Sequence, residues 1–193
     1  MGGLEMSGKD EMNELPKRLN LGSGRRKQAD AWNVDRVAAV EPDLVWDLDR
    51  TPYPLPAGHF ERICAFDVVE HLGDLIAFVE EAHRLLAPGG TLEITTPHYS
   101  CSNSFTDPTH RHHLGCFSFD YFTDRSGWNF YSEVRFEIAL RVLVFPPGRL
   151  SGLFARWANR HPEIYERRFA WIVPAWFLHF ELVKVGAPPV GSA

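Results

Sequence analysis

The sequence predicts one α/β domain built on an open, mostly parallel sheet with an antiparallel pair of strands at one edge. Short runs of aliphatic and aromatic residues recur along the chain, with the length and composition typical of strands. An amphipathic stretch at 73–90 lies between two such runs and predicts a strand–helix–strand unit, which requires a right-handed crossover between parallel strands. The last two runs are long and alternate between apolar and polar residues, and this pattern predicts the antiparallel pair.

Seven apolar runs give the expected strands in chain order. They are RLNLG, WNVDRV, DLVWDL, FERICAF, TLEITTP, EVRFEIALRVLVF and WFLHFELVKV. In the sixth run, alternation directs one set of side chains to a single face: Phe136, Ile138, Leu140, Val142 and Val144. We therefore expect the sixth and seventh runs to pair along the edge of the sheet.

The clearest helix is expected within the sequence GDLIAFVEEAHRLLAPGG. Its apolar residues recur at helical spacing on one face, namely Leu75, Phe78, Val79, Ala82, Leu85 and Leu86. Asp74 has the position of the N-cap, and Pro88, Gly89 and Gly90 are expected to end the helix.

The domain is expected to span residues 15–185, because a chain of 193 residues suits one well-formed core. Residues 1–14 are expected to be a flexible leader and 186–193 a flexible tail, since neither shows apolar periodicity. Two inserts, 98–132 and 146–176, follow expected strands. Loops at such positions in α/β proteins commonly contact the substrate.

Composition excludes several classes of protein. Apolar residues make up 45% and charged residues 23% of the chain, as in soluble globular domains. The net charge of -5 argues against binding to duplex nucleic acid but leaves short RNA open. The three cysteines show no paired spacing, which favours a reducing compartment, and no run is long enough to be an export signal or a transmembrane helix. We expect a cytoplasmic protein without a transmembrane segment.

The stretch LNLGSG suggests a cofactor loop. Gly22 and Gly24 follow a strand-like run, and the absence of side chains lets a ligand approach the backbone. A dinucleotide site is disfavoured, because no third glycine follows and Asp35 comes only eleven residues after Gly24. Asp35 and Asp47, at the ends of successive strands, are nevertheless placed to accept hydrogen bonds from a ribose and from an adenine amine. The alternative is a tight turn followed by unrelated strand-end carboxylates.

Five motifs in order resemble the class I S-adenosylmethionine-dependent methyltransferases: LNLGSG, NVD, DL, VVEHL and LLAPGGTLEITTPH. The resemblance covers about 19–97. DPTHRHH, FSFDYF and LHFEL also resemble small bacterial members often associated with modification of sugars or secondary metabolites. This family implies a Rossmann-like seven-stranded sheet in the order 3-2-1-4-5-7-6, with helices on both faces.

The resemblance also implies the cofactor-binding residues. Gly22, Ser23 and Gly24 would lie under the methionine part of S-adenosylmethionine, Asp35 would hold the ribose, and Asp47 with Leu48 would hold the adenine. The remaining members of the implied cofactor site are Asn20, Phe66 and His71. Two departures stand out: Asn20 takes a position that is acidic in many members, and the first helix must be shortened to about one turn.

The sequence defines less well which residues lie at the part of the site where methyl transfer would take place. His98 directly follows the fifth strand, so its imidazole is placed to act as the catalytic base, although it could instead order the following loop. Glu70 is expected to orient the helix that begins near Asp74. His110, His112 and His113 are interpreted as substrate contacts. A metal site is not expected, because adjacent histidines point apart in extended chain and no ligand spacing such as Cys-x-x-Cys appears.

These patterns leave three functions open. The first is methyl transfer to a small molecule, more readily to an oxygen than to a nitrogen, with a sugar or secondary metabolite as the acceptor. The second is a partner or regulatory subunit that binds S-adenosylmethionine without methyl transfer. The third is a membrane-surface enzyme acting on a lipid-linked sugar. Arginine and aromatic residues in 146–180 motivate the third and are equally compatible with a helical lid or a homodimer contact.

Overall fold

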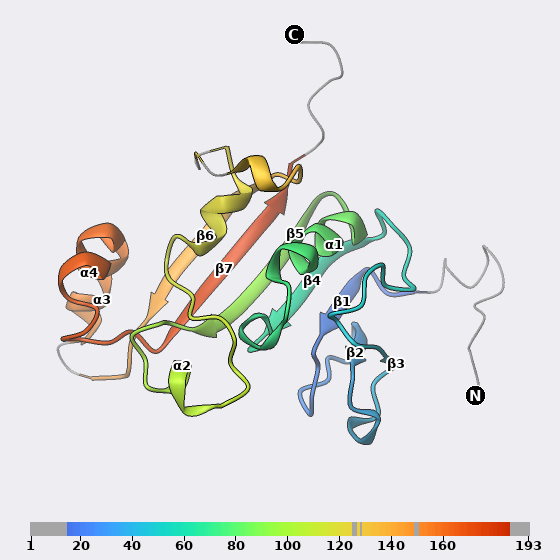
Figure 1. Cartoon of the computed structure of the whole chain (residues 1–193), viewed down its shortest axis with the longest axis horizontal. Coiled ribbons are helices and arrows are strands. Elements are labelled where there is room, and N and C mark those ends of the chain that lie inside the picture. Colours follow the sequence, from blue (N-terminus) through green and yellow to red (C-terminus); the bar gives the residue numbers. More distant parts are fainter. Residues whose placement is uncertain (1–14, 125–126, 128, 149–150, 186–193) are drawn as a thin grey trace, which may run out of the picture.

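The computed structural model describes residues 15–124, 127, 129–148 and 151–185. Its seven strands form one sheet in the order β3-β2-β1-β4-β5-β7-β6, as the sequence predicts (Figure 1). The strands are β1 (Arg18–Leu21), β2 (Trp32–Asp35), β3 (Leu44–Val45), β4 (Phe60–Phe66), β5 (Leu86–Pro97), β6 (Phe136–Val144) and β7 (Phe177–Lys184). Strands β1 to β5 are parallel, and β7 runs antiparallel to both β5 and β6. The predicted leader and tail lie outside the described residues.

The centre of the sheet buries aligned rows of apolar side chains. Leu19 of β1 lies beside Ile63 of β4, Ile63 beside Leu92 of β5, and Leu92 beside Leu182 of β7, and all four are fully buried. Such rows form because side chains at paired positions of neighbouring strands point to the same face. They belong to one hydrophobic core together with the buried face of helix α1 (Leu75–Leu85).

Helix α1 begins as predicted, because a carboxylate oxygen of Asp74 accepts the Ala77 N–H at 2.9 Å. Its end differs from the prediction. The helix stops at Leu85, and the Pro-Gly-Gly segment lies within β5. Two backbone N–H groups of the preceding loop explain this: Gly58 and His59 donate to the last carbonyls of the helix at 2.9 Å, so the chain becomes extended at once.

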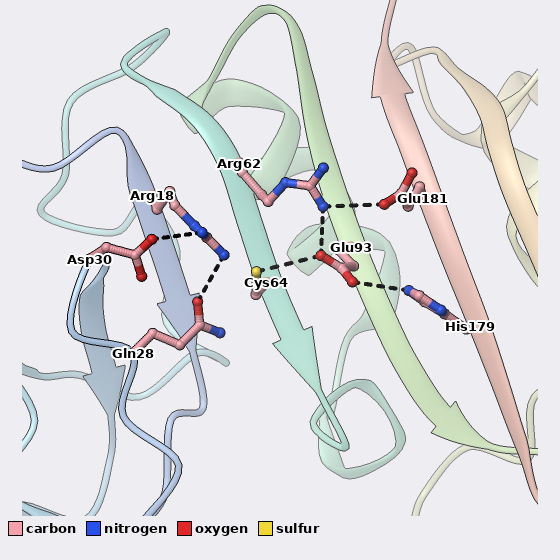
Figure 2. A network of polar contacts seen from close by, with 8 residues as sticks. All are labelled: Arg18, Gln28, Asp30, Arg62, Cys64, Glu93, His179 and Glu181. Carbon is pink, nitrogen blue, oxygen red and sulfur yellow. Dashed lines mark hydrogen bonds and ion pairs between the residues drawn. The ribbon is translucent and has the colours of Figure 1, made fainter.

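The face of the sheet opposite α1 carries a polar network across β1, β4, β5 and β7 (Figure 2). Arg62 donates to Glu93 at 2.7 Å and to Glu181 at 3.2 Å, and His179 contacts the second oxygen of Glu93 at 3.0 Å. The charged side chains of this network are partly exposed. The shortened segment after β1 contains turns but no helix, where a helix of about one turn is expected.

The predicted alternation along β6 is wrong beyond Ile138. Ile138 pairs with Leu182, but the next pair along β7 is Leu140 with Glu181, so β6 contains one extra residue at Ala139. A bulge of this kind moves the following side chains to the opposite faces. Leu143 is consequently buried, whereas Val144 is 39% exposed.

Both inserts contain short helices. The first includes α2 (Asn103–Thr106) and two 3-10 helices, Ser118–Phe122 and Asn129–Tyr131. The second includes α3 (Ser151–Arg160) and α4 (Pro162–Arg168), which lie beyond β6 in Figure 1. Tyr165 of α4 is fully buried in the core, as expected for a segment packed on the sheet. Among the helices of the described residues, none has the length and apolarity to cross a bilayer.

Candidate functional site

A pocket of about 210 Å³ lies at the carboxyl ends of the first four strands. Segments that follow four different strands meet there, and the first insert contributes one residue. The lining residues are Gly22, Asp35, Arg36, Asp47, Leu48, Asp49, Asp67, Val68, His71, Leu72 and Thr109. In an open α/β sheet this is where ligands bind, because the strand order reverses there and the connecting loops separate. Four carboxylates and one guanidinium make the lining predominantly acidic.

The floor of the pocket is a backbone bend at Gly22. Its φ of +67° is in the left-handed region, and a Cβ at this position would lie 2.3 Å from Cγ2 of Val68. The N–H groups of Gly22 and Ser23 both donate to the Val34 carbonyl, at 2.8 and 3.0 Å. Only glycine therefore allows the bend to lie this close to Val68 without strain.

Two strand-end carboxylates meet in this pocket, as the sequence predicts. Asp35 accepts the N–H of Gly24 at 2.8 Å through one oxygen and the N–H of Val37 at 2.9 Å through the other. Asp47 accepts the N–H of Asp49 at 3.1 Å. Because backbone donors hold these carboxylates in place, their remaining lone pairs have fixed directions.

Four of the residues expected to contact a cofactor do not line the pocket: Asn20, Ser23, Gly24 and Phe66. Asn20 is buried, and its amide donates to the Arg26 carbonyl at 3.1 Å and to Asn33 at 3.0 Å. Its role in the structure is to support the loop from beneath. Ser23 is also buried, and its hydroxyl has no hydrogen-bond partner among the described residues.

Asp67 lines the pocket and was not singled out by the sequence analysis, which selected its neighbour Phe66. Asp67 has a φ of +57° directly after β4. Its carboxylate accepts from the Thr95 hydroxyl at 3.2 Å and from the Arg26 guanidinium at 2.9 Å. The sequence pattern that selected Asp35, an acidic residue at a strand end, would also have selected Asp67, which directly follows β4.

A second, more open pocket of about 580 Å³ adjoins the first and shares Asp67 and His71 with it. It is lined by Asp67, Glu70, His71, Pro97, Asn103, Thr106, Asp107, Pro108, His110 and Phe177. No lysine or arginine of the described residues is part of this lining. A ligand in the second pocket would lie next to a ligand in the first.

Glu70 is part of the second pocket, which corrects the expectation that it orients helix α1. The N-cap of that helix is Asp74. Glu70 is 2% exposed, and one of its carboxylate oxygens accepts from the Thr96 hydroxyl at 3.0 Å. Burial raises the pKa of Glu70 to about 7.

Of the three histidines expected to contact a substrate, His110 lines the second pocket, and the other two are in neither of the two linings. The ring of His110 lies edge-on to that of His71, with 4.6 Å between the ring centres. Burial lowers the pKa of His71, and the neighbouring His110 adds to this effect. His113 instead contacts the Ser104 hydroxyl and stacks on an exposed phenylalanine, and His112 lies outside both linings.

The structure does not support His98 as the catalytic base. The side chain is fully buried and outside both pocket linings. Both ring nitrogens are engaged: Nδ1 lies 2.8 Å from the Ser100 hydroxyl and 3.2 Å from the Ser100 N–H, and Nε2 lies 3.1 Å from the Glu166 carboxylate. Glu166 also accepts the Cys116 N–H at 2.5 Å. His98 therefore joins helix α4 to the first insert and has no free lone pair for a substrate proton.

Comparisons with known proteins agree with this geometry. A family model described as a methyltransferase domain matches residues 7–141. A curated protein of Mycolicibacterium smegmatis, a probable S-adenosylmethionine-dependent methyltransferase, is 43% identical over 44 residues; the match spans 23% of this chain and only 17% of that protein.

Solved structures share the fold at low sequence identity. A SAM dependent methyltransferase from Archaeoglobus fulgidus superposes with a TM-score of 0.56 at 17% identity, over 90% of this chain and 88% of that chain. The 16S rRNA (adenine(1408)-N(1))-methyltransferase from Catenulisporales acidiphilia superposes with a TM-score of 0.53 at 16% identity, over 97% and 95% of the chains. A shared fold of this kind does not identify an acceptor.

Proposed function

The chain belongs to the methyltransferase domain family of class I S-adenosylmethionine-dependent enzymes, and we propose that it methylates a small molecule bound in the second pocket. The observation that carries this proposal is the adjacency of the two pockets, which share Asp67 and His71. A methyl donor in one pocket and an acceptor in the other would be in contact across these residues.

The chemistry of the first pocket suits S-adenosylmethionine. The bound cofactor supplies an electrophilic methyl group on a positively charged sulfonium. Its ribose hydroxyls and adenine amine are hydrogen-bond donors, and Asp35 and Asp47 are acceptors held in place by backbone N–H groups. The Gly22 bend lines the same pocket, and the methionine part would lie against its backbone.

Positioning supplies much of the rate of methyl transfer, because the acceptor atom must lie in line and about 3 Å from the carbon. A hydroxyl acceptor also has to lose a proton. Three groups that can hold a proton or a cation line the second pocket: Glu70, His71 and His110. They support transfer to an oxygen, in place of the role first assigned to His98.

We further propose that the acceptor is a sugar or secondary metabolite met in the cytosol. The three cysteines are buried free thiols, as suits a reducing compartment. The acidic lining of the second pocket disfavours a phosphate-rich acceptor such as RNA.

Calorimetric titration with S-adenosylmethionine and S-adenosylhomocysteine tests the cofactor site. We expect one site per chain, and roughly 10- to 100-fold weaker binding in Asp35→Asn, because a hydrogen bond to a charged group contributes about 1.5–3 kcal/mol. Asp30→Asn is the matched control, since Asp30 is exposed and pairs with Arg18 away from the pocket. Equal affinities of the two variants would contradict the assignment.

Transfer of a tritiated methyl group to sugars, to phenolic metabolites and to ribosomal RNA tests the acceptor. Labelled sugar or phenol would support the proposal, whereas label in RNA alone would overturn it. Tight cofactor binding without transfer to any acceptor would favour a partner or regulatory subunit instead.

A further inference from the structure

We propose that Glu70, His71 and His110 bind one divalent transition-metal ion, such as Zn²⁺, Fe²⁺ or Mn²⁺, in the second pocket. Each residue offers one ligand atom, and the three atoms lie within 4.8 Å of one another. Metal bonds of about 2.1 Å require ligand atoms closer together than this, so modest side-chain rotations would complete the site. Binding of the ion does not depend on methyl transfer, but the use of the ion to hold an acceptor rests on the proposed function.

The backbone brings the three ligands together. Glu70 and His71 are adjacent in the 3-10 helix Val69–His71 after β4, and His110 comes from the first insert. The insert is fastened to that helix next to the ligands, because the N–H groups of Arg111 and His112 donate to the Glu70 carbonyl at 2.7 and 3.1 Å. The arrangement is therefore set by main-chain contacts and would persist without an ion.

Hydrogen bonds fix both imidazoles in the form that a metal requires. Nδ1 of His110 lies 3.2 Å from the Ser104 carbonyl, which can only accept, so Nδ1 carries the proton and Nε2 keeps its lone pair. Nδ1 of His71 lies 2.8 Å from the Thr109 hydroxyl, which already donates to Asp107 at 2.7 Å. This hydroxyl must accept from His71, so Nε2 of His71 also keeps its lone pair.

The chain from His71 through Thr109 to Asp107 is a typical outer-shell arrangement for a metal-bound histidine. Ligating imidazoles usually donate their second N–H to a carbonyl or a carboxylate, directly or through another group, and this orients the ring. Both histidines of the cluster have such an acceptor, and neither Nε2 has a hydrogen bond in the described part of the chain.

The charge of the pocket also favours a cation. Glu70 is buried with a single hydroxyl donor, Thr96, and takes part in none of the ion pairs between described residues. Asp67 and Asp107 add two further carboxylates to a lining that has no basic side chain besides histidine in the described residues. A buried carboxylate is stabilised by a metal ion as well as by an ion pair.

Two imidazole nitrogens and one carboxylate suit zinc, iron(II) or manganese(II) better than calcium, which prefers oxygen ligands alone. Three protein ligands leave open positions on the ion. A hydroxyl oxygen of the acceptor in the second pocket could occupy one of them, and the ion would then lower the pKa of that hydroxyl and fix its orientation beside the cofactor pocket.

The test uses the full chain, treated with a chelator, and titrated with Zn²⁺ in a calorimeter and with Co²⁺ in an absorption spectrometer. We expect one site per chain and visible Co²⁺ bands of a protein-bound ion. His110→Gln and Glu70→Gln should weaken Zn²⁺ binding at least about tenfold, because loss of even an outer-shell partner of a ligand typically weakens metal binding by about 10- to 100-fold. His113→Gln is the matched control, because His113 is an exposed histidine of the same insert outside the pocket lining.

A missing 1:1 site, or a site equally strong in His110→Gln and His113→Gln, would overturn the inference. S-adenosylhomocysteine titrated into the same samples reports whether each variant is folded. It also separates the two proposals: cofactor binding without metal binding overturns the metal site alone, and metal binding without cofactor binding overturns the proposed function alone.

Discussion

Replacing Gly22 with alanine tests whether the bend after β1 shapes the cofactor pocket. The φ of +67° costs an alanine about 1–2 kcal/mol in the left-handed region. The new Cβ would also lie 2.3 Å from Cγ2 of Val68. Rotation of the Val68 side chain does not remove the clash, because its Cγ1 and Cβ also lie 3.1 and 3.3 Å from the position of the added Cβ. Overpacking of this kind costs about 1–3 kcal/mol.

Gly24 provides the matched control. Its φ of +49° is also positive, but an added Cβ would meet nothing within 4 Å. Gly24→Ala should therefore lose only the backbone contribution, about 1–2 kcal/mol. Alanine restricts the unfolded chain equally at both positions, so this effect cancels in the comparison.

Urea unfolding of the two variants measures the difference. We expect Gly22→Ala to lose about 1–3 kcal/mol more free energy of unfolding than Gly24→Ala, and to bind S-adenosylhomocysteine more weakly. In a Val68→Ala background the extra loss should largely disappear, because the opposing methyl groups are gone. Equal losses in the two glycine variants, or no relief from Val68→Ala, would refute the reasoning.

Three further predictions concern the helix cap, the half-buried His83 and the buried His98. Asp74→Ala should lower the free energy of unfolding by about 1 kcal/mol in urea while Asp74→Asn stays close to wild type, and equal losses would contradict the capping role. Burial lowers the pKa of His83 to about 4, so the unfolded chain binds more protons between pH 6.5 and 4 and stability falls across this window as the pH drops. Urea unfolding of His83→Leu should show a shallower pH dependence there, and an unchanged slope would exclude His83 as the cause. His98→Ala should lower the midpoint of thermal unfolding, because the Glu166 carboxylate loses its contact with the imidazole. The affinity for S-adenosylhomocysteine should stay unchanged. Weaker binding by the folded variant would indicate that His98 belongs to the functional site.

The strand order was implied by the resemblance to class I methyltransferases, whereas the meeting of Asp35 with Asp47 could be predicted because it depends on a rule of parallel sheets. Asp35 ends β2 and Asp47 lies two residues beyond the end of β3, and the carboxyl ends of neighbouring parallel strands lie at the same edge. Asn20 shows the limit of this reasoning. It precedes the glycine loop in sequence, but its side chain is turned beneath the loop, where Asn33 binds it.

His98 and Glu70 could not be placed from the sequence, because distant residues decide their surroundings. His98 meets Glu166, a partner 68 positions along the chain. Glu70 meets Thr96 of β5, so its carboxylate lines a pocket instead of the start of a helix. The same holds for the bulge at Ala139, since pairing with β7 determines where the extra residue lies.

A crystal structure of the protein grown with S-adenosylhomocysteine tests the central claim most directly, namely that the acidic pocket at the strand ends holds the nucleoside. We predict the ribose against Asp35, the adenine beside Asp47 and the chain of the amino acid over Gly22. A nucleoside bound elsewhere, or a pocket without ligand at saturating concentration, would contradict the account.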